Sequence, residues 1–201
     1  MNIALLLLCL LSISIQPAFA NDMLILEVTS ARRAENSITL EDYRFIGQKT
    51  QFIFDDDKGI FLFGDESGTI VFKIDDIEKL RLLFEKYLSW EEIAVTNKVK
   101  IYKDLPESVF TTEIVYGKTS RGDYIKESIH FKVSFYSASE TEHFIVFDSG
   151  RGGRTIYSFL SEPLYIGKSE VQKLYSSIQE EKVEQYIEEY RKKEKVKELF
   201  K

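Results

Sequence analysis

The chain has 201 residues, a formal net charge of −6 and one cysteine, Cys9. A single cysteine excludes a disulfide framework, and a mature chain without residues 1–20 has no thiolate for catalysis or metal binding. Neither half of the chain carries a strong basic excess, which argues against nucleic acid as a partner, since binding to a phosphate backbone needs a basic surface.

Residues 1–20 have the pattern of an export signal. An apolar run over residues 4–15 is followed by Ala18 and Ala20, the small residues of a signal-peptidase site, so we expect cleavage before Asn21. The alternative is an uncleaved membrane anchor, although the run is short of the about 20 residues that span a bilayer. The sequence therefore predicts a secreted or periplasmic protein, and the lack of disulfides and N-glycosylation sequons favours a bacterial one.

The first half of the mature chain, about residues 21–97, predicts an antiparallel meander followed by a helix. We expect strands at residues 23–28 and 37–45, then three short strands separated by the hairpin turns at Gly59 and Gly68. The helix is predicted by apolar residues that recur every three or four positions: Ile77, Leu80, Phe84, Tyr87 and Leu88.

Capping signals predict that this helix is interrupted. Asp75 with Glu78 has the spacing of a capping box, and so does Ser89 with Glu92. We therefore expect a helix that starts after Asp75, breaks near Ser89, restarts at Trp90 and closes at Asn97. A tryptophan at such a break would be half exposed, which makes Trp90 a candidate anchor for a partner.

The second half, about residues 98–190, repeats this order. Strands are expected at residues 109–116 and 128–136, then from His143, and at 164–166. A helix capped by Ser169 follows, with an apolar stripe at Val171, Leu174, Tyr175 and Ile178. An offset of 94 residues aligns the two halves and predicts an internal repeat; the alternative is a chance recurrence of strands followed by a helix.

The chain ends in a long predicted helix. Its apolar stripe restarts at Val183, five residues after Ile178, so we expect a break or a phase shift between the two. Residues 191–201 hold six basic and two acidic side chains and form a basic helical tail. Such a tail is typical of a solvated surface and would contact an anionic membrane only weakly. Residues 21–190 together predict a single α+β domain of antiparallel meander sheets, each followed by a covering helix.

The glycine-rich segment 147–155, "FDSGRGGRT", is a candidate binding loop. A phosphate-binding loop needs a helix directly after its glycines, whereas here the strand-like "TIYSFL" follows. We expect a hairpin turn. The alternative is an anion-binding loop in which Arg151 and Arg154 contact a carboxylate or phosphate.

A catalytic alternative depends on the register of one hairpin. Pairing Phe135 with Phe144 sets His130 opposite Ser149, a nucleophile beside a base, as in a small hydrolase. The strained nucleophile turn that serine hydrolases use is absent from the sequence.

No metal or cofactor site is predicted. His130 and His143 lack the spacing of zinc ligands, and the Asp55–Asp57 run lacks that of a calcium loop. The sequence thus favours an exported binding or interaction module over an enzyme. Its predicted contact residues are Arg151, Arg154 and Trp90, and its partner is an unknown protein or a small anionic ligand.

Overall fold

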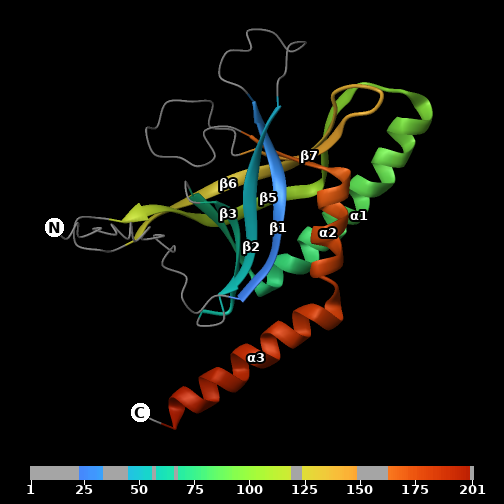
Figure 1. The fold of residues 1–201 in the computed structure, drawn as a ribbon. Helices are drawn as coiled ribbons and strands as arrows, with labels where there is room; N and C mark the ends of the chain where they lie inside the picture. The colour runs from blue at the N-terminus through green and yellow to red at the C-terminus, as the bar shows by residue number, and fades with distance from the viewer. Residues whose placement is uncertain are drawn as a thin grey trace, which may run out of the picture.

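The computed structural model describes residues 23–33, 45–55, 58–65, 68–118, 124–148 and 163–199. Within these ranges eight strands form one antiparallel sheet in chain order, and β8 pairs with β1, so that the sheet closes on itself (Figure 1). The strands are β1 (Met23–Arg33), β2 (Phe45–Asp55), β3 (Ile60–Asp65), β4 (Gly68–Lys73), β5 (Ile101–Lys118), β6 (Tyr124–Ser137), β7 (His143–Asp148) and β8 (Leu164–Gly167). The helices are α1 (Ile74–Asn97), α2 (Lys168–Ser177) and α3 (Glu180–Glu198). The chain thus has the predicted α+β class, antiparallel strands and long C-terminal helix.

The two predicted meanders join into a single sheet. Strands β1–β4 precede α1, and β5–β8 precede α2. The halves meet where Ile70 of β4 pairs with Ile114 of β5, and again where Ser30 of β1 pairs with Ile166 of β8. The internal repeat stays a prediction, because a shared order of elements does not establish a common origin.

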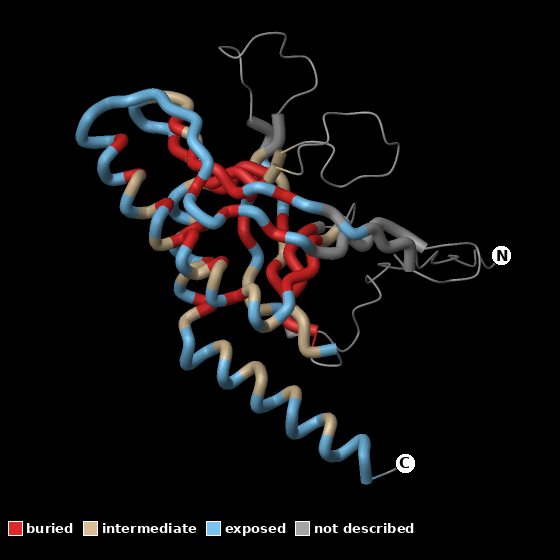
Figure 2. Tube along the Cα trace, turned by 180° about the vertical axis from the view of Figure 1, so that it is seen from behind, coloured by how far each residue is buried: buried red, intermediate tan, exposed pale blue. Residues whose placement is uncertain are grey.

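One aromatic core lies between the sheet and the first two helices, and buried residues gather there in Figure 2. Phe63 of β3 lies 5.9 Å from Phe147 of β7, and Phe72 of β4 lies 5.9 Å from Phe131 of β6, measured between ring centroids. Both contacts cross from one half of the chain to the other. Burying an apolar side chain of this size contributes about 2–3 kcal/mol, so the halves are held together by the same rings that fill each of them.

Helix α1 is continuous, so the predicted break near Ser89 is wrong. Tyr87, Glu91 and Ala94 are all buried, and their spacing of four and three residues keeps one face of the helix on the protein past Ser89. The predicted cap at Asp75 is also wrong: the N-cap is Lys73, whose backbone N–H donates to the Asp76 carboxylate at 3.0 Å. The predicted end at Asn97 is confirmed.

The break predicted between the two C-terminal apolar stripes is confirmed. Helix α2 ends at Ser177 and α3 begins at Glu180. The N-cap of α2 is Gly167 instead of the predicted Ser169. The segment from residue 149 to 162 and most of the predicted strand at 37–45 lie outside the described residues.

Candidate functional site

A groove runs between α1 and the junction of α2 with α3. Its volume is about 340 Å³. It is lined by Ile74, Ile77, Glu78, Arg81, Ile178, Glu180, Val183 and Glu184. Ile77 and Ile178 are almost fully buried and form an apolar floor, while the charged residues lie around it.

The α2–α3 junction is held in one geometry by local hydrogen bonds. The side-chain amide of Gln179 donates to the backbone carbonyl of Tyr175 at 2.8 Å. The carbonyl of Gln179 in turn accepts from the N–H groups of Lys182 and Val183 in the first turn of α3. Because Ile178, the C-cap of α2, is buried in the core, it fixes where α3 leaves the domain and hence where Glu180 and Val183 lie.

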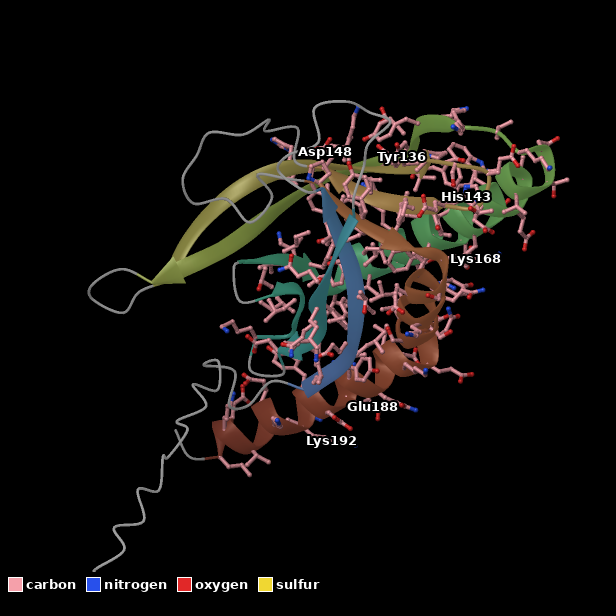
Figure 3. The ribbon with its side chains drawn as sticks, turned by 45° about the horizontal axis from the view of Figure 1, so that its top comes forward. Tyr136, His143, Asp148, Lys168, Glu188 and Lys192 are labelled. Carbon is pink, nitrogen blue, oxygen red and sulfur yellow. The ribbon has the colours of Figure 1, made fainter. Side chains whose placement is uncertain are left out.

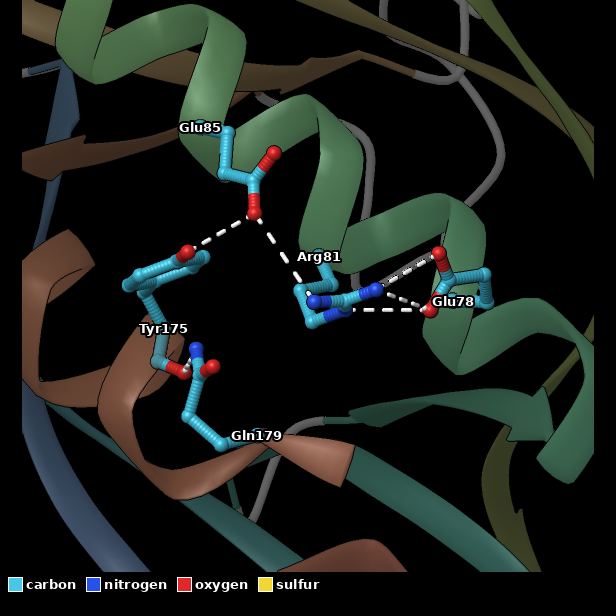
Figure 4. Close-up of polar contacts among 5 residues, drawn as sticks. All are labelled: Glu78, Arg81, Glu85, Tyr175 and Gln179. Atoms are coloured by element: carbon cyan, nitrogen blue, oxygen red, sulfur yellow. Dashed lines mark hydrogen bonds and ion pairs between the residues drawn. The ribbon is translucent and has the colours of Figure 1, made fainter. Parts of the chain in front are cut away.

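Arg81 is the one basic residue among those that line the groove, and two glutamates already bind it (Figure 4). Its guanidinium donates to both carboxylate oxygens of Glu78, with the shortest contacts at 2.7 Å, and lies 3.8 Å from Glu85. The hydrogen bond to Glu78 raises the pKa of Arg81, with a further contribution from Glu85. The positive charge of Arg81 is therefore offset from within α1.

Glu85 also connects α1 to α2. The hydroxyl of Tyr175 donates to Glu85 at 2.7 Å (Figure 4), and this hydrogen bond raises the pKa of the Tyr175 phenol. Glu180 and Glu184 lie on the α3 side of the groove, and no ion pair joins either of them to another described side chain. The groove thus combines an apolar floor with a net negative rim, which suits a ligand that carries both apolar and cationic groups.

Trp90 lies on α1, outside the groove. Its ring is partly buried and packs edge-on against Phe135 at 6.0 Å between centroids. The ammonium groups of Lys86 and Lys103 lie 5.5 Å and 5.1 Å from the ring centroid, within range of a cation–π interaction. Part of the Trp90 ring is thus covered by Phe135 and by the two lysine side chains. The role of Trp90 as a partner anchor stays a prediction.

The two predicted anion-binding residues, Arg151 and Arg154, lie outside the described residues, together with Ser149 and the glycines between them. The hairpin turn predicted for these glycines and the strand-like segment at residues 155–160 expected after it lie outside them too. Neither the anion-binding interpretation nor the turn is tested by the described residues.

The register that supported a hydrolase is wrong by one residue. Phe135 pairs with Ile145 instead of the predicted Phe144, and Val133 pairs with Phe147 instead of Val146. The reason is a five-residue turn, closed by a hydrogen bond from the N–H of Ala138 to the carbonyl of Glu142 at 2.9 Å. A one-residue slip changes every cross-strand neighbour.

His130 has a different neighbour, on the other side of β6. Its Nδ1 lies 2.9 Å from the hydroxyl of Thr111 on β5.

A polar cluster separate from the groove lies where α1, the β6–β7 hairpin and the start of α2 meet. Its members are Tyr87, Glu91, Ser137, His143 and Lys168, and Figure 3 labels His143 and Lys168. The hydroxyl of Tyr87 donates to the His143 carbonyl at 2.8 Å, and Lys168 donates to the buried carboxylate of Glu91 at 2.6 Å. The Nδ1 of His143 lies 3.0 Å from the hydroxyl of Ser137. These bonds join three elements that are distant in sequence, and the sequence analysis did not find them.

The predicted absence of a metal site has no direct test here. Among the described residues, no three His, Cys, Asp or Glu side chains gather as metal ligands do. Asp55 closes the β2–β3 turn: its carboxylate accepts from the backbone N–H of Lys58 at 2.9 Å and pairs with the Lys58 ammonium. None of the described helices is long and apolar enough to cross a membrane.

No family model, curated protein or solved structure matches the chain.

Proposed function

We propose that the chain is an exported interaction module that binds a protein segment bearing apolar and basic side chains in the groove between α1 and the α2–α3 junction. The observation that carries this proposal is the combination of an apolar lining, in which Ile74 and Val183 are only partly buried, with Glu180 and Glu184 at the rim. Arg81 does not oppose a cationic ligand, because Glu78 and Glu85 already bind it.

The size of the groove favours side chains of a peptide over a large cofactor. Its volume of about 340 Å³ is near the lower end of the range for ligand pockets, about 300–1,000 Å³. An exposed ion pair contributes about 0.2–1 kcal/mol. Two basic side chains of the ligand, paired with Glu180 and Glu184, therefore add selectivity more than affinity. Ile77 and Ile178 are already almost fully buried, so the apolar surface that a ligand can still cover belongs to the partly buried Ile74 and Val183. We therefore expect weak binding, since the hydrophobic contribution scales with the apolar area removed from water.

The proposal is tested with two synthetic peptides of matched length, one of lysine and leucine and one of glutamate and leucine, titrated into the protein by calorimetry. We expect binding of the lysine peptide only. The double variant Glu180→Lys, Glu184→Lys should weaken that binding about tenfold or more, while Glu92→Lys, an exposed charge change at the far end of α1, should leave it unchanged. Equal binding of both peptides, or of the lysine peptide to wild type and to the double variant, would overturn the proposal.

Export is supported by the signal pattern of residues 1–20 alone. It is tested by expressing the chain with its own N-terminus in a bacterial host and sequencing the protein from the periplasm or medium. Asn21 is the expected first residue. Recovery of the chain in the membrane fraction with residues 1–20 intact would favour the anchor, and recovery in the cytoplasm would refute export. The alternative of a small hydrolase through His130 and Ser149 has lost the register that supported it.

A further inference from the structure

Helix α3 separates its charges along its length. Residues 180–190 carry five glutamates and one lysine, whereas residues 191–198 carry five basic side chains and two glutamates. The boundary lies near Glu188 and Lys192, which form a long ion pair of 3.9 Å and are labelled in Figure 3.

The acidic part of α3 packs against the sheet. Tyr186 packs against Phe54 and Phe61 at 5.8 Å and 6.2 Å between ring centroids. The ring of Tyr190 covers Gly59, where an added Cβ would lie 3.1 Å from it. Beyond Tyr190 the helix projects away from the sheet (Figure 1), and its residues are mostly exposed (Figure 2).

The projecting part presents apolar as well as basic side chains. Val196 is 54% exposed and Leu199 is 81% exposed, next to Arg191, Lys195 and other basic residues. This is the chemistry that suits the groove: apolar groups for its floor and cations for Glu180 and Glu184.

The projecting part cannot reach the groove of its own chain. Glu184 and Lys195 lie on one continuous helix, so at 1.5 Å per residue they are held about 16 Å apart along its axis. An occupant with this chemistry must come from a second molecule.

We propose that the groove binds the basic part of α3 from a second copy of this chain, with the two α3 helices antiparallel. Each acidic part then lies beside the basic part of the other helix, and the two contacts are equivalent about a two-fold axis. This inference rests on the proposed function, since it names the partner of that same groove.

The helix dipole is another explanation for the charge separation in α3, but it accounts for only the two ends of the helix. Acidic residues near the start of a helix and basic ones near its end stabilise an isolated helix through its dipole, but this effect is confined to the first and last turns. In α3 the charges keep their segregation to the middle, at Glu188 and Glu189 and then Arg191 and Lys192. The dipole also does not account for the exposure of Val196 and Leu199.

The test is the oligomeric state of the full chain, purified after expression with its own N-terminus and measured by sedimentation equilibrium. We expect a monomer–dimer equilibrium that weakens as salt is raised. The groove variant Glu180→Lys, Glu184→Lys and the tail variant Arg191→Glu, Lys195→Glu should each raise the dissociation constant about tenfold or more, with helix content checked by circular dichroism. Glu92→Lys serves as the matched control and should dimerise like wild type.

Two combinations keep the test independent of effects on folding. An equimolar mixture of the groove variant and the tail variant should form a heterodimer, because each basic surface then meets an acidic one. A chain that carries all four substitutions should dimerise with itself again. If neither combination restores association that the single variants lost, the proposed pairing is refuted.

A monomeric wild type at the highest soluble concentration overturns this inference, and the peptide titration then shows separately whether the groove binds a basic segment at all. A further refuting result is binding of the monomer to vesicles of anionic phospholipid that the tail variant abolishes and the groove variant does not. The basic part of α3 would then be a contact for a membrane surface.

Discussion

Replacing Tyr87 with phenylalanine tests the polar cluster that joins α1 to β7. The side chain is fully buried, and its hydroxyl donates to the His143 carbonyl at 2.8 Å. The substitution keeps the ring and leaves that buried carbonyl without its donor, which costs about 1–2 kcal/mol. Near neutral pH we therefore expect Tyr87→Phe to lower the free energy of unfolding by about 1.5 kcal/mol.

The same variant has a distinctive pH dependence. Burial, with a further contribution from the charge of Glu91, raises the pKa of the Tyr87 phenol well above its ordinary value of 10.0. The unfolded chain then releases this proton at a lower pH than the folded chain, so the stability that Tyr87 contributes is complete below pH 10 and falls as pH rises above it.

The magnitude follows from the linkage of protonation to folding. Through Tyr87, the free energy of unfolding of wild type should fall by about 0.4 kcal/mol at about pH 10 and by about 1.4 kcal/mol at about pH 11. Tyr87→Phe lacks the phenol and cannot show this decrease. The stabilities of the two proteins should therefore converge near pH 11.

The assay is urea unfolding followed by far-ultraviolet circular dichroism at several pH values from about 8 to about 11. Tyr102→Phe is the control for neutral pH, since Tyr102 is 52% exposed and its substitution should change stability by less than about 0.5 kcal/mol. A difference between wild type and Tyr87→Phe that stays constant over this range would refute the argument. So would equal stability at neutral pH.

Two ion pairs give further predictions. Lys168→Met leaves the carboxylate of Glu91, whose side chain is 6% exposed, without its cation, and should lower the free energy of unfolding by about 1–3 kcal/mol. The double variant Lys168→Met, Glu91→Met should lose less stability than the sum of the losses of the two single variants. Strict additivity of these losses would contradict the pairing. At Asp104, hydrogen bonds from Lys132 and then Ser134 hold the carboxyl pKa below its ordinary value of 3.8, so the stability it contributes is present above about pH 4 and is lost as pH falls through the lowered pKa. In Lys132→Met the Asp104 pKa should move upward in a carbon-detected NMR titration, and an unchanged titration would show that Lys132 does not act on it.

The sequence predicted the elements whose signals are local. The stripe from Ile77 to Tyr87 is the buried face of α1, the hairpin turn at Gly59 is present, and the phase shift after Ile178 marks the α2–α3 break. Such features depend on side chains within a few residues of one another, so periodicity and turn chemistry are enough to find them. The errors at Asp75 and Ser89 arose because capping signals are weak beside the burial of a whole helix face.

Contacts between distant residues were decided by the tertiary structure. Closure of the sheet depends on the pairing of Ser30 with Ile166, and no local pattern encodes that pair. Helix α2 meets α1 where Tyr175 contacts Glu85, 90 residues away in the chain, and the polar cluster includes the contact of Lys168 with Glu91, 77 residues away. Local periodicity sets which face of an element is apolar, but only the packing of all the faces into one core determines which charged side chains come to lie together.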